Sequence, residues 1–287
     1  MTTKSLFAFV VLGPAFAGLG CRAAAPPVTP EVIAVTRQTL PTDPADRAWE
    51  DAPIHESPLL LQDLVEPRLM AASTPSVRVR AITDGTRVAF RLDWSDATVD
   101  DRPVAGAFTD ACAVQVPAAA GPDVPAPQMG EASRPVEITY WRASWQAVVD
   151  GRGDTINDIH PGATVDHYPF EAASLEDKSS AQQEMALRYA PARALGNAMA
   201  GPRDRPVEDL VADGPGTLKP AATTDSTGRG RRVADGWSVV IVRRLPAGAQ
   251  PGGRGQVAFA IWEGGHQEAG SRKMRTGWVI LAREAGK

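Results

Sequence analysis

Apolar and polar residues alternate along several short stretches of this chain, with the period of two that is typical of β-strands with one buried face. The clearest stretch covers residues 76–96 (SVRVRAITDGTRVAFRLDWSD), where two alternating runs flank Asp84 and Gly85. Because Asp-Gly favours a tight hairpin turn, this stretch predicts two antiparallel strands. Five further stretches predict strands, at residues 110–117, 134–150, 236–245, 255–264 and 276–284.

The long middle of the chain, residues 150–235, lacks this alternation. It holds one weak helical pattern at residues 180–190, ended by Pro191, and a stretch at residues 223–236 that is typical of a surface loop. Short strands, long loops and little helix favour an all-β fold, a β-sandwich. We predict a single domain of this kind over residues 46–287.

The N-terminus has the pattern of an export signal. Lys4 precedes an apolar run at residues 6–20 that is too short and too glycine-rich for a membrane span. We therefore expect a signal peptide over residues 1–20, a flexible lead-in over residues 21–45, and a periplasmic location. The sequence around Cys21 partly matches a lipoprotein signal, so simple cleavage and a lipid anchor at Cys21 are both open.

Charge and cysteine content exclude several classes of protein. The net charge of −4 gives no electrostatic reason to expect nucleic-acid binding. The chain has two cysteines, and only Cys112 is left if Cys21 is cleaved off or acylated, which rules out an internal disulfide. No C-x-x-C-H motif is present, so covalent c-type haem is excluded, as are cysteine-ligated zinc and iron–sulfur sites.

Two residues stand out as candidate metal ligands. Met129 lies on a loop (PAPQMGE, residues 125–131) that prolines stiffen and Gly130 frees at its exit. It either fills a gap in the core or presents its thioether to a soft metal such as haem iron. Lys273, in SRKMR (residues 271–275), either lies at a solvated strand entrance or coordinates a metal as a neutral amine.

Other residues allow a different function. His160 and His167 lie close in sequence and could bind a metal, although no third ligand completes a known spacing. Trp141 and Trp145 should share one face of the strand predicted at residues 134–150, and with Trp262 they could stack on a sugar. An extracytoplasmic carbohydrate-binding module is therefore the alternative function. A hydrolase is disfavoured, since no nucleophile and base form a recognisable motif.

Taken together, several stretches of this sequence resemble one known family over residues 76–285. The similar proteins are the haem b (gamma) subunits of type II dimethyl sulfoxide reductase-family molybdoenzymes, such as ethylbenzene dehydrogenase, dimethyl sulfide dehydrogenase and the chlorate and selenate reductases. The stretches that carry the resemblance, in order, are DACAVQVP, PAPQMGE, VEITYWRASWQ, VEDLVADGPGTL, DGWSVVIVRRL and AFAIWEGGHQEAGSRKMRTGWVIL.

The resemblance implies an immunoglobulin-like β-sandwich that binds one non-covalent haem b. It implies Met129 and Lys273 as the two axial ligands of the iron, with the polar SRKMR segment near the iron and the propionates. It further implies an electron-transfer subunit that performs no substrate chemistry itself. Its partners would be a molybdopterin-containing catalytic subunit, an iron–sulfur subunit and a soluble electron carrier such as a cytochrome c.

Overall fold

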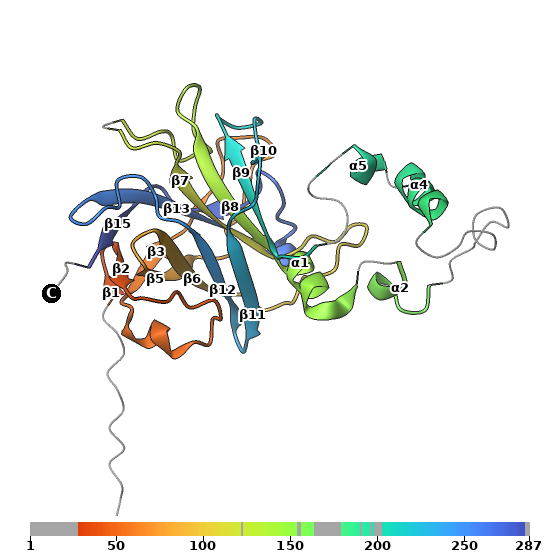
Figure 1. Ribbon diagram of the computed structural model, residues 1–287, viewed down its shortest axis with the longest axis horizontal. Helices are drawn as coiled ribbons and strands as arrows, with labels where there is room; N and C mark the ends of the chain where they lie inside the picture. The colour runs from red at the N-terminus through yellow and green to blue at the C-terminus, as the bar shows by residue number, and fades with distance from the viewer. Residues whose placement is uncertain are drawn as a thin grey trace, which may run out of the picture.

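The fold is a sandwich of two β-layers, shown in a computed structural model (Figure 1). The structure describes residues 28–121, 123–153, 156–163, 179–189, 191–195, 197 and 203–284. The predicted signal peptide, Cys21 and His167 lie outside these residues. The prediction of an all-β sandwich with long loops and little helix is confirmed.

The first layer runs in the order β11-β12-β6-β5-β2-β15, and β3 pairs with β5 beyond the end of β2. Pairing in β12-β6-β5 is antiparallel, whereas β2 is parallel to both of its neighbours. The strands of this layer are β1 (Val28–Thr29), β2 (Val32–Thr36), β3 (Ile54–Pro58), β5 (Ser76–Thr83), β6 (Arg87–Ser95), β11 (Thr227–Val233), β12 (Gly236–Arg244) and β15 (Val279–Arg283).

The second layer runs in the order β10-β9-β8-β7-β13-β14-β4, with antiparallel pairing throughout. Its strands are β4 (Leu60–Leu61), β7 (Ala111–Pro117), β8 (Val136–Arg142), β9 (Val207–Ala212), β10 (Lys219–Pro220), β13 (Arg254–Trp262) and β14 (Met274–Arg275). Strand β13 joins the two layers: residues 254–257 pair with β15, and residues 258–262 pair with β7.

Helical segments are short and lie outside the strands. They are η1 (Arg47–Asp51), α1 (Ala143–Ala147), η2 (Val148–Arg152), α2 (Ile156–Ile159), α4 (Ser180–Tyr189), α5 (Pro191–Ala194) and η3 (Gly264–His266). Helix α4 confirms the helical pattern predicted at residues 180–190. None of the helices in the described ranges is long and apolar enough to cross a membrane.

The main core lies between the layers, because alternate residues of each strand face inward. Phe90 of β6 meets Phe259 of β13 edge to face, with ring centroids 6.0 Å apart, so the two layers are in direct contact. The predicted hairpin at residues 76–96 is confirmed, since β5 and β6 pair in register around Asp84 and Gly85. A smaller core around Trp49 covers the outer face of the first layer.

Three predictions about strands and loops are wrong. Residues 32–36, predicted to lie in a flexible lead-in, form β2 between β15 and β5. The partners of β2 are distant in sequence, so no local hairpin pattern marks it. Residues 134–150, predicted as one strand, form β8 and then turn into α1 and η2 after Arg142. Trp141 and Trp145 therefore lie on different elements.

The predicted surface loop at residues 223–236 is also wrong, because half of it, residues 227–233, is the edge strand β11. Its glycines suggested a loop, but they serve close packing. A Cβ atom on Gly230 would lie 2.1 Å from the Trp141 ring, and one on Gly228 would lie 2.4 Å from Val207. Glycine at alternate positions of β11 therefore leaves room for the buried Trp141 ring, while Arg229 and Arg231 at the other positions are exposed.

Candidate cofactor site

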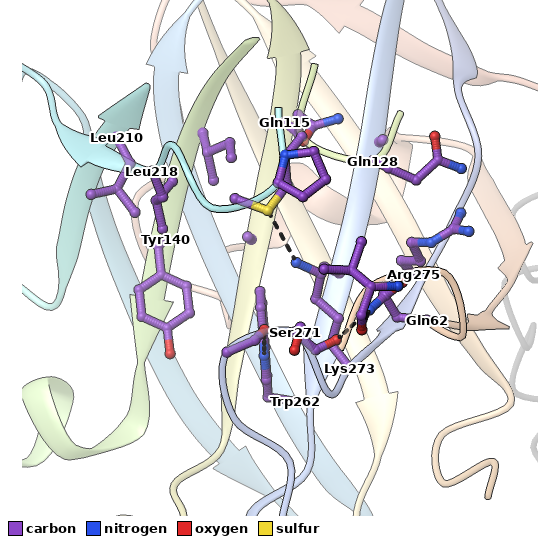
Figure 2. A pocket seen from close by; sticks show the side chains of 18 of the residues that line it. Gln62, Gln115, Gln128, Tyr140, Leu210, Leu218, Trp262, Ser271, Lys273 and Arg275 are labelled. Atoms are coloured by element: carbon purple, nitrogen blue, oxygen red, sulfur yellow. Dashed lines mark hydrogen bonds between the residues drawn. The ribbon is translucent and has the colours of Figure 1, made fainter. Parts of the chain in front are cut away.

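A cavity of about 620 Å³ lies on the outer face of the second layer, on the side away from the main core (Figure 2). Its floor is formed by outward-facing residues of β7 and β13, and three of these are Ala113, Ala258 and Ala260. Because these side chains are small, the sheet surface is recessed there. A flat apolar ligand can therefore lie close to the backbone of the sheet.

Met129 closes the cavity from the loop between β7 and β8. Neighbouring elements fix this loop in place. Gln115 of β7 donates from Nε2 to Pro127 O at 3.0 Å, Trp278 donates from Nε1 to Pro125 O at 2.6 Å, and the backbone N–H of Gly214 donates to Met129 O at 2.9 Å. The loop is thus held by three separate parts of the chain.

The backbone at Met129 is in the left-handed region, with φ of 71°, and Gly130 follows at 77°. For a residue with a side chain such a conformation costs on the order of 1–3 kcal/mol and persists where the surroundings enforce it, often at functional sites. Gly130 is required for space as well, since a Cβ there would lie 3.0 Å from Arg134 O and 3.1 Å from Ala212 O. This conformation directs the thioether into the cavity.

Lys273 reaches the same cavity from the opposite wall, on the turn before β14. Its Nζ lies 3.8 Å from Met129 Sδ and 5.1 Å from the centroid of the Trp262 ring. Burial, together with the positive charge of Arg275, lowers the pKa of Lys273 to about 8. No carboxylate in the described part of the chain forms an ion pair with this amine, so its neutral form is unusually accessible.

The backbone at Lys273 is held by a segment distant in sequence, residues 59–74. The backbone N–H of Gln62 donates to Lys273 O at 3.2 Å, and its side chain donates from Nε2 to Ser271 O at 3.1 Å and to Val65 O at 2.9 Å. The Gln62 Oε1 accepts from the backbone N–H groups of Leu64 and Val65. A single buried amide therefore links two loops that border the cavity.

Aromatic rings form one side of the site. Tyr140 lies edge to face between Trp262 and Trp145, with ring centroids 5.2 Å and 5.5 Å away. Burial raises the pKa of Tyr140 to about 12, so its phenol stays neutral. The guanidinium of Arg203 stacks on Trp145 at 3.8 Å from the ring centroid. These contacts make the wall next to Lys273 rigid.

The structure brings the side chains of Met129 and Lys273 together in the cavity and places the neighbouring methionine, Met274, elsewhere. Met274, next to Lys273, is 1% exposed and packs in the main core, on the opposite side of the chain from the cavity. This agrees with the alternation expected of neighbouring strand residues. A thioether and an amine that face each other across an apolar cavity can donate lone pairs to one metal ion from opposite sides.

The tryptophans do not form a sugar-binding surface. Trp141 is 0% exposed, Trp145 5% and Trp262 8%, and Trp141 lies between the layers against Trp94 and Trp237. A stacking platform needs exposed ring faces, so these three rings do not support the carbohydrate-binding alternative.

The other candidate ligands are not assembled into a metal site. His160 is exposed, and His266 is bound to Glu263 at 2.8 Å outside the cavity lining. Cys112 is buried in the main core, and its burial raises the pKa of the thiol. In the described ranges, no group of three or more histidine, cysteine, aspartate or glutamate side chains could hold a metal ion.

Comparison with known proteins places the chain in a family. The family model described as ethylbenzene dehydrogenase matches residues 46–274, which is most of the chain. The chain therefore belongs to the ethylbenzene dehydrogenase family. The matched region includes the Met129 loop, the floor of the cavity and Lys273.

Individual relatives share this chain's sequence or shape to different degrees. "Putative respiratory nitrate reductase heme subunit ORF7" of Haloferax mediterranei is 32% identical over 153 residues, which are 52% of this chain and 51% of that protein. The chain thus matches about half the length of this curated relative.

Among solved structures, a family 9 carbohydrate-binding module from Caldicellulosiruptor kristjanssonii in complex with glucose has a TM-score of 0.40 at 7% identity, and covers 90% of this chain and 97% of that chain. The same module in complex with cellotriose has a TM-score of 0.37 at 9% identity, and covers 90% and 95%.

Several residues of the site carry no pattern in the sequence that identifies them. Gln62 and Tyr140 belong to segments far from Met129 and Lys273, and only the folded chain brings them together. The small floor residues Ala113, Ala258 and Ala260 are ordinary strand residues in the sequence. Their alternation with large inward residues indicated which face they occupy, but not that a cavity lies above them.

Proposed function

We propose that the cavity binds one non-covalent haem b, with Met129 and Lys273 as the axial ligands of the iron. The observation that carries this proposal is the 3.8 Å approach of Met129 Sδ to Lys273 Nζ inside an apolar cavity. In zinc sites, metal–nitrogen and metal–sulfur bonds are about 2.1 Å and about 2.3 Å long. A metal ion between the two donors would therefore require a sulfur–nitrogen distance less than 1 Å longer than the 3.8 Å found here. The residues present therefore fit the group.

The chain's own residues would supply what such a group needs. The alanine floor and the surrounding aromatic rings exclude water and fit a flat macrocycle. The Met129 loop and the segment around Gln62 hold the two donors from opposite walls. A bound haem would supply reversible one-electron chemistry, and a thioether donor favours the reduced metal.

We further propose that the chain is an electron-transfer subunit of a periplasmic molybdoenzyme. It would pass single electrons between an iron–sulfur subunit and an external carrier such as a cytochrome c, while a molybdopterin-containing subunit transforms the substrate. Membership of the ethylbenzene dehydrogenase family supports this role, as does the relative named as a nitrate reductase heme subunit. Export through the N-terminal signal and, if Cys21 is acylated, a lipid anchor belong to the same proposal.

The absorption spectrum of the purified chain tests haem binding. We expect a Soret band, sharp bands of a six-coordinate low-spin haem on reduction, and extraction of the haem into acidified organic solvent, since no covalent link holds it. A colourless chain that also fails to bind added haemin would overturn the proposal.

Purification from the native cells under gentle conditions tests the subunit role. We expect the chain to co-purify with an iron–sulfur protein and a molybdenum protein. Recovery of a haem-bearing chain that never associates with such proteins would refute the complex while leaving haem binding intact.

A further inference from the structure

The two sides of the cavity differ in polarity. Leu210, Leu218 and Tyr140 lie on one side of the Met129–Lys273 pair, whereas Gln62, Gln128 and Arg275 lie on the other (Figure 2). The strand order gives the same division. Strand β14, which carries Arg275, and the short strand β10 lie toward opposite ends of the second layer, with β9, β8, β7 and β13 between them. The cavity is therefore amphipathic along its length.

Arg275 is the most unusual polar residue of this cavity. It is 9% exposed, and its buried Nε has no hydrogen-bond partner among the described residues. Its Nη1 makes one long bond, 3.4 Å, to the neighbouring Thr276 O. A buried guanidinium normally forms short bonds with a carboxylate, often two in parallel. Arg275 is held in place without such a partner.

The charges around the cavity do not supply that partner. Burial lowers the pKa of Arg275, and the negative charge of Asp63 acts against this by raising it. In the described part of the chain, however, Asp63 forms no ion pair with Arg275. Glu66 also lines the cavity, but its carboxylate is paired with Arg68 at 2.7 Å. A ligand with a negatively charged edge would complete the site, because it would satisfy a buried donor that lacks one.

We propose that the cavity orients its haem, with the propionate edge toward Arg275 and the apolar edge toward Leu210 and Leu218. The inference rests on the proposed function. The resemblance implies only that the SRKMR segment lies near the propionates, and the structure adds Arg275 as the residue that binds them and the direction in which the apolar edge lies. Besides Lys273, the proposed iron ligand, the remaining basic residue of the lining is Lys219 on β10, but it is exposed, so water already solvates its amine. Arg275 gains more from a carboxylate partner, since hydrogen bonds to charged groups strengthen where water is excluded.

Haem dimethyl ester provides the test, since it keeps the iron and the ring but lacks both propionate charges. The full chain, stripped of haem, is titrated with haem and with the ester in the same mild detergent, and the Soret band reports binding. We expect the wild-type chain to bind haem roughly ten- to a hundredfold more tightly than the ester, as for the loss of a hydrogen bond to a charged group. Equal affinities would overturn the orientation.

Three variants identify the residue responsible. Arg275→Gln should weaken haem binding by the same factor and leave ester binding unchanged, Arg275→Lys should retain part of the preference, and Lys219→Gln should change neither affinity. Loss of the preference in Lys219→Gln would place the propionates at the other end, and an equal loss for both ligands in Arg275→Gln would make Arg275 merely structural. If the wild-type chain binds neither ligand, the proposed function itself fails. Thermal unfolding of each haem-free variant controls for misfolding.

Discussion

Met129 Sδ lies 3.8 Å from Lys273 Nζ, although 144 residues separate them in the chain. The two side chains come from separate loops that are each fixed by distant parts of the fold, so their meeting is enforced by the sandwich. Both side chains are unbranched, and a cavity that needed only apolar filling would not place a lysine amine beside a methionine sulfur. The arrangement gives each donor a separate and measurable role.

Changing the donors one at a time should produce different spectra. Met129→Ala removes the thioether and should give five-coordinate or water-ligated iron, with a potential lowered by on the order of 0.1 V, within the range that axial ligands control. Lys273→Ala should remove the nitrogen donor, and Lys273→Arg should not restore it, because a guanidinium stays protonated. Optical and electron paramagnetic resonance spectra with redox titration measure these effects.

Met274→Ala is the matched control for the ligand variants. Met274 faces the main core, so its loss should lower stability by about 2–5 kcal/mol, as for other buried methionines, and leave the iron spectrum unchanged. The reverse pattern, with Met274→Ala altering the spectrum and Met129→Ala leaving it intact, would show that the Met129 loop only packs.

Deprotonation of the buried Lys273 should add stability to the haem-free protein as pH rises from about 8 to about 10. Burial lowers the folded-state pKa of Lys273 from 10.5 to about 8, so within this window the unfolded chain binds the extra proton. Stability rises with pH wherever the unfolded state binds more protons, by roughly 2 kcal/mol here. Below pH 8 both states are protonated, and this contribution no longer changes.

Urea unfolding of the haem-free wild type and of Lys273→Met, compared at several pH values, isolates this effect. Cys112 and Tyr140, whose pKa values burial raises, act in the opposite direction at the upper end of the window, but they are common to both proteins and cancel in the difference. Lys273→Met should be the more stable protein at pH 7, and its advantage should shrink as pH rises. A difference that does not vary with pH would show that the amine keeps its ordinary pKa.

Local patterns predicted the elements whose partners are close in sequence, and long-range contacts formed the rest. The hairpin of β5 and β6 follows from alternation around Asp84 and Gly85, whereas β2 depends on strands far along the chain. Met129 and Lys273 were singled out because a rigid loop and a lysine in an apolar chain end are unusual. Gln62 and Arg275 act through the three-dimensional arrangement, which periodicity does not encode.

Gln62→Ala should make the Lys273 segment more mobile, although the Gln62 side chain itself makes no hydrogen bond to Lys273. The substitution leaves two backbone N–H groups and the carbonyls of Val65 and Ser271 without their bonds to Gln62, which should cost about 1–3 kcal/mol of stability. The wall that holds Lys273 would become mobile, so a fraction of the haem should lose its nitrogen donor.

Low-temperature electron paramagnetic resonance would detect that fraction as a second iron species. Gln250→Ala, at an exposed glutamine in the turn before β13, is the control and should leave both stability and spectrum unchanged. A single unaltered iron species in Gln62→Ala would mean that Lys273 is positioned by its other contacts.

Gly230→Ala tests the packing that links the edge strand β11 to the second layer. The added Cβ would lie 2.1 Å from the Trp141 ring, and the ring cannot simply move away, because it contacts Trp94 and Trp237 edge to face, with centroids 6.3 Å and 5.2 Å away. Overpacking of this kind costs roughly 1–3 kcal/mol. Gly277→Ala is the matched control, since a Cβ there meets nothing within 4 Å. Urea unfolding should show a lower midpoint for Gly230→Ala alone. Equal midpoints for both variants would mean that β11 can shift away from Trp141, and that the glycines at alternate positions of β11 are not needed for this contact.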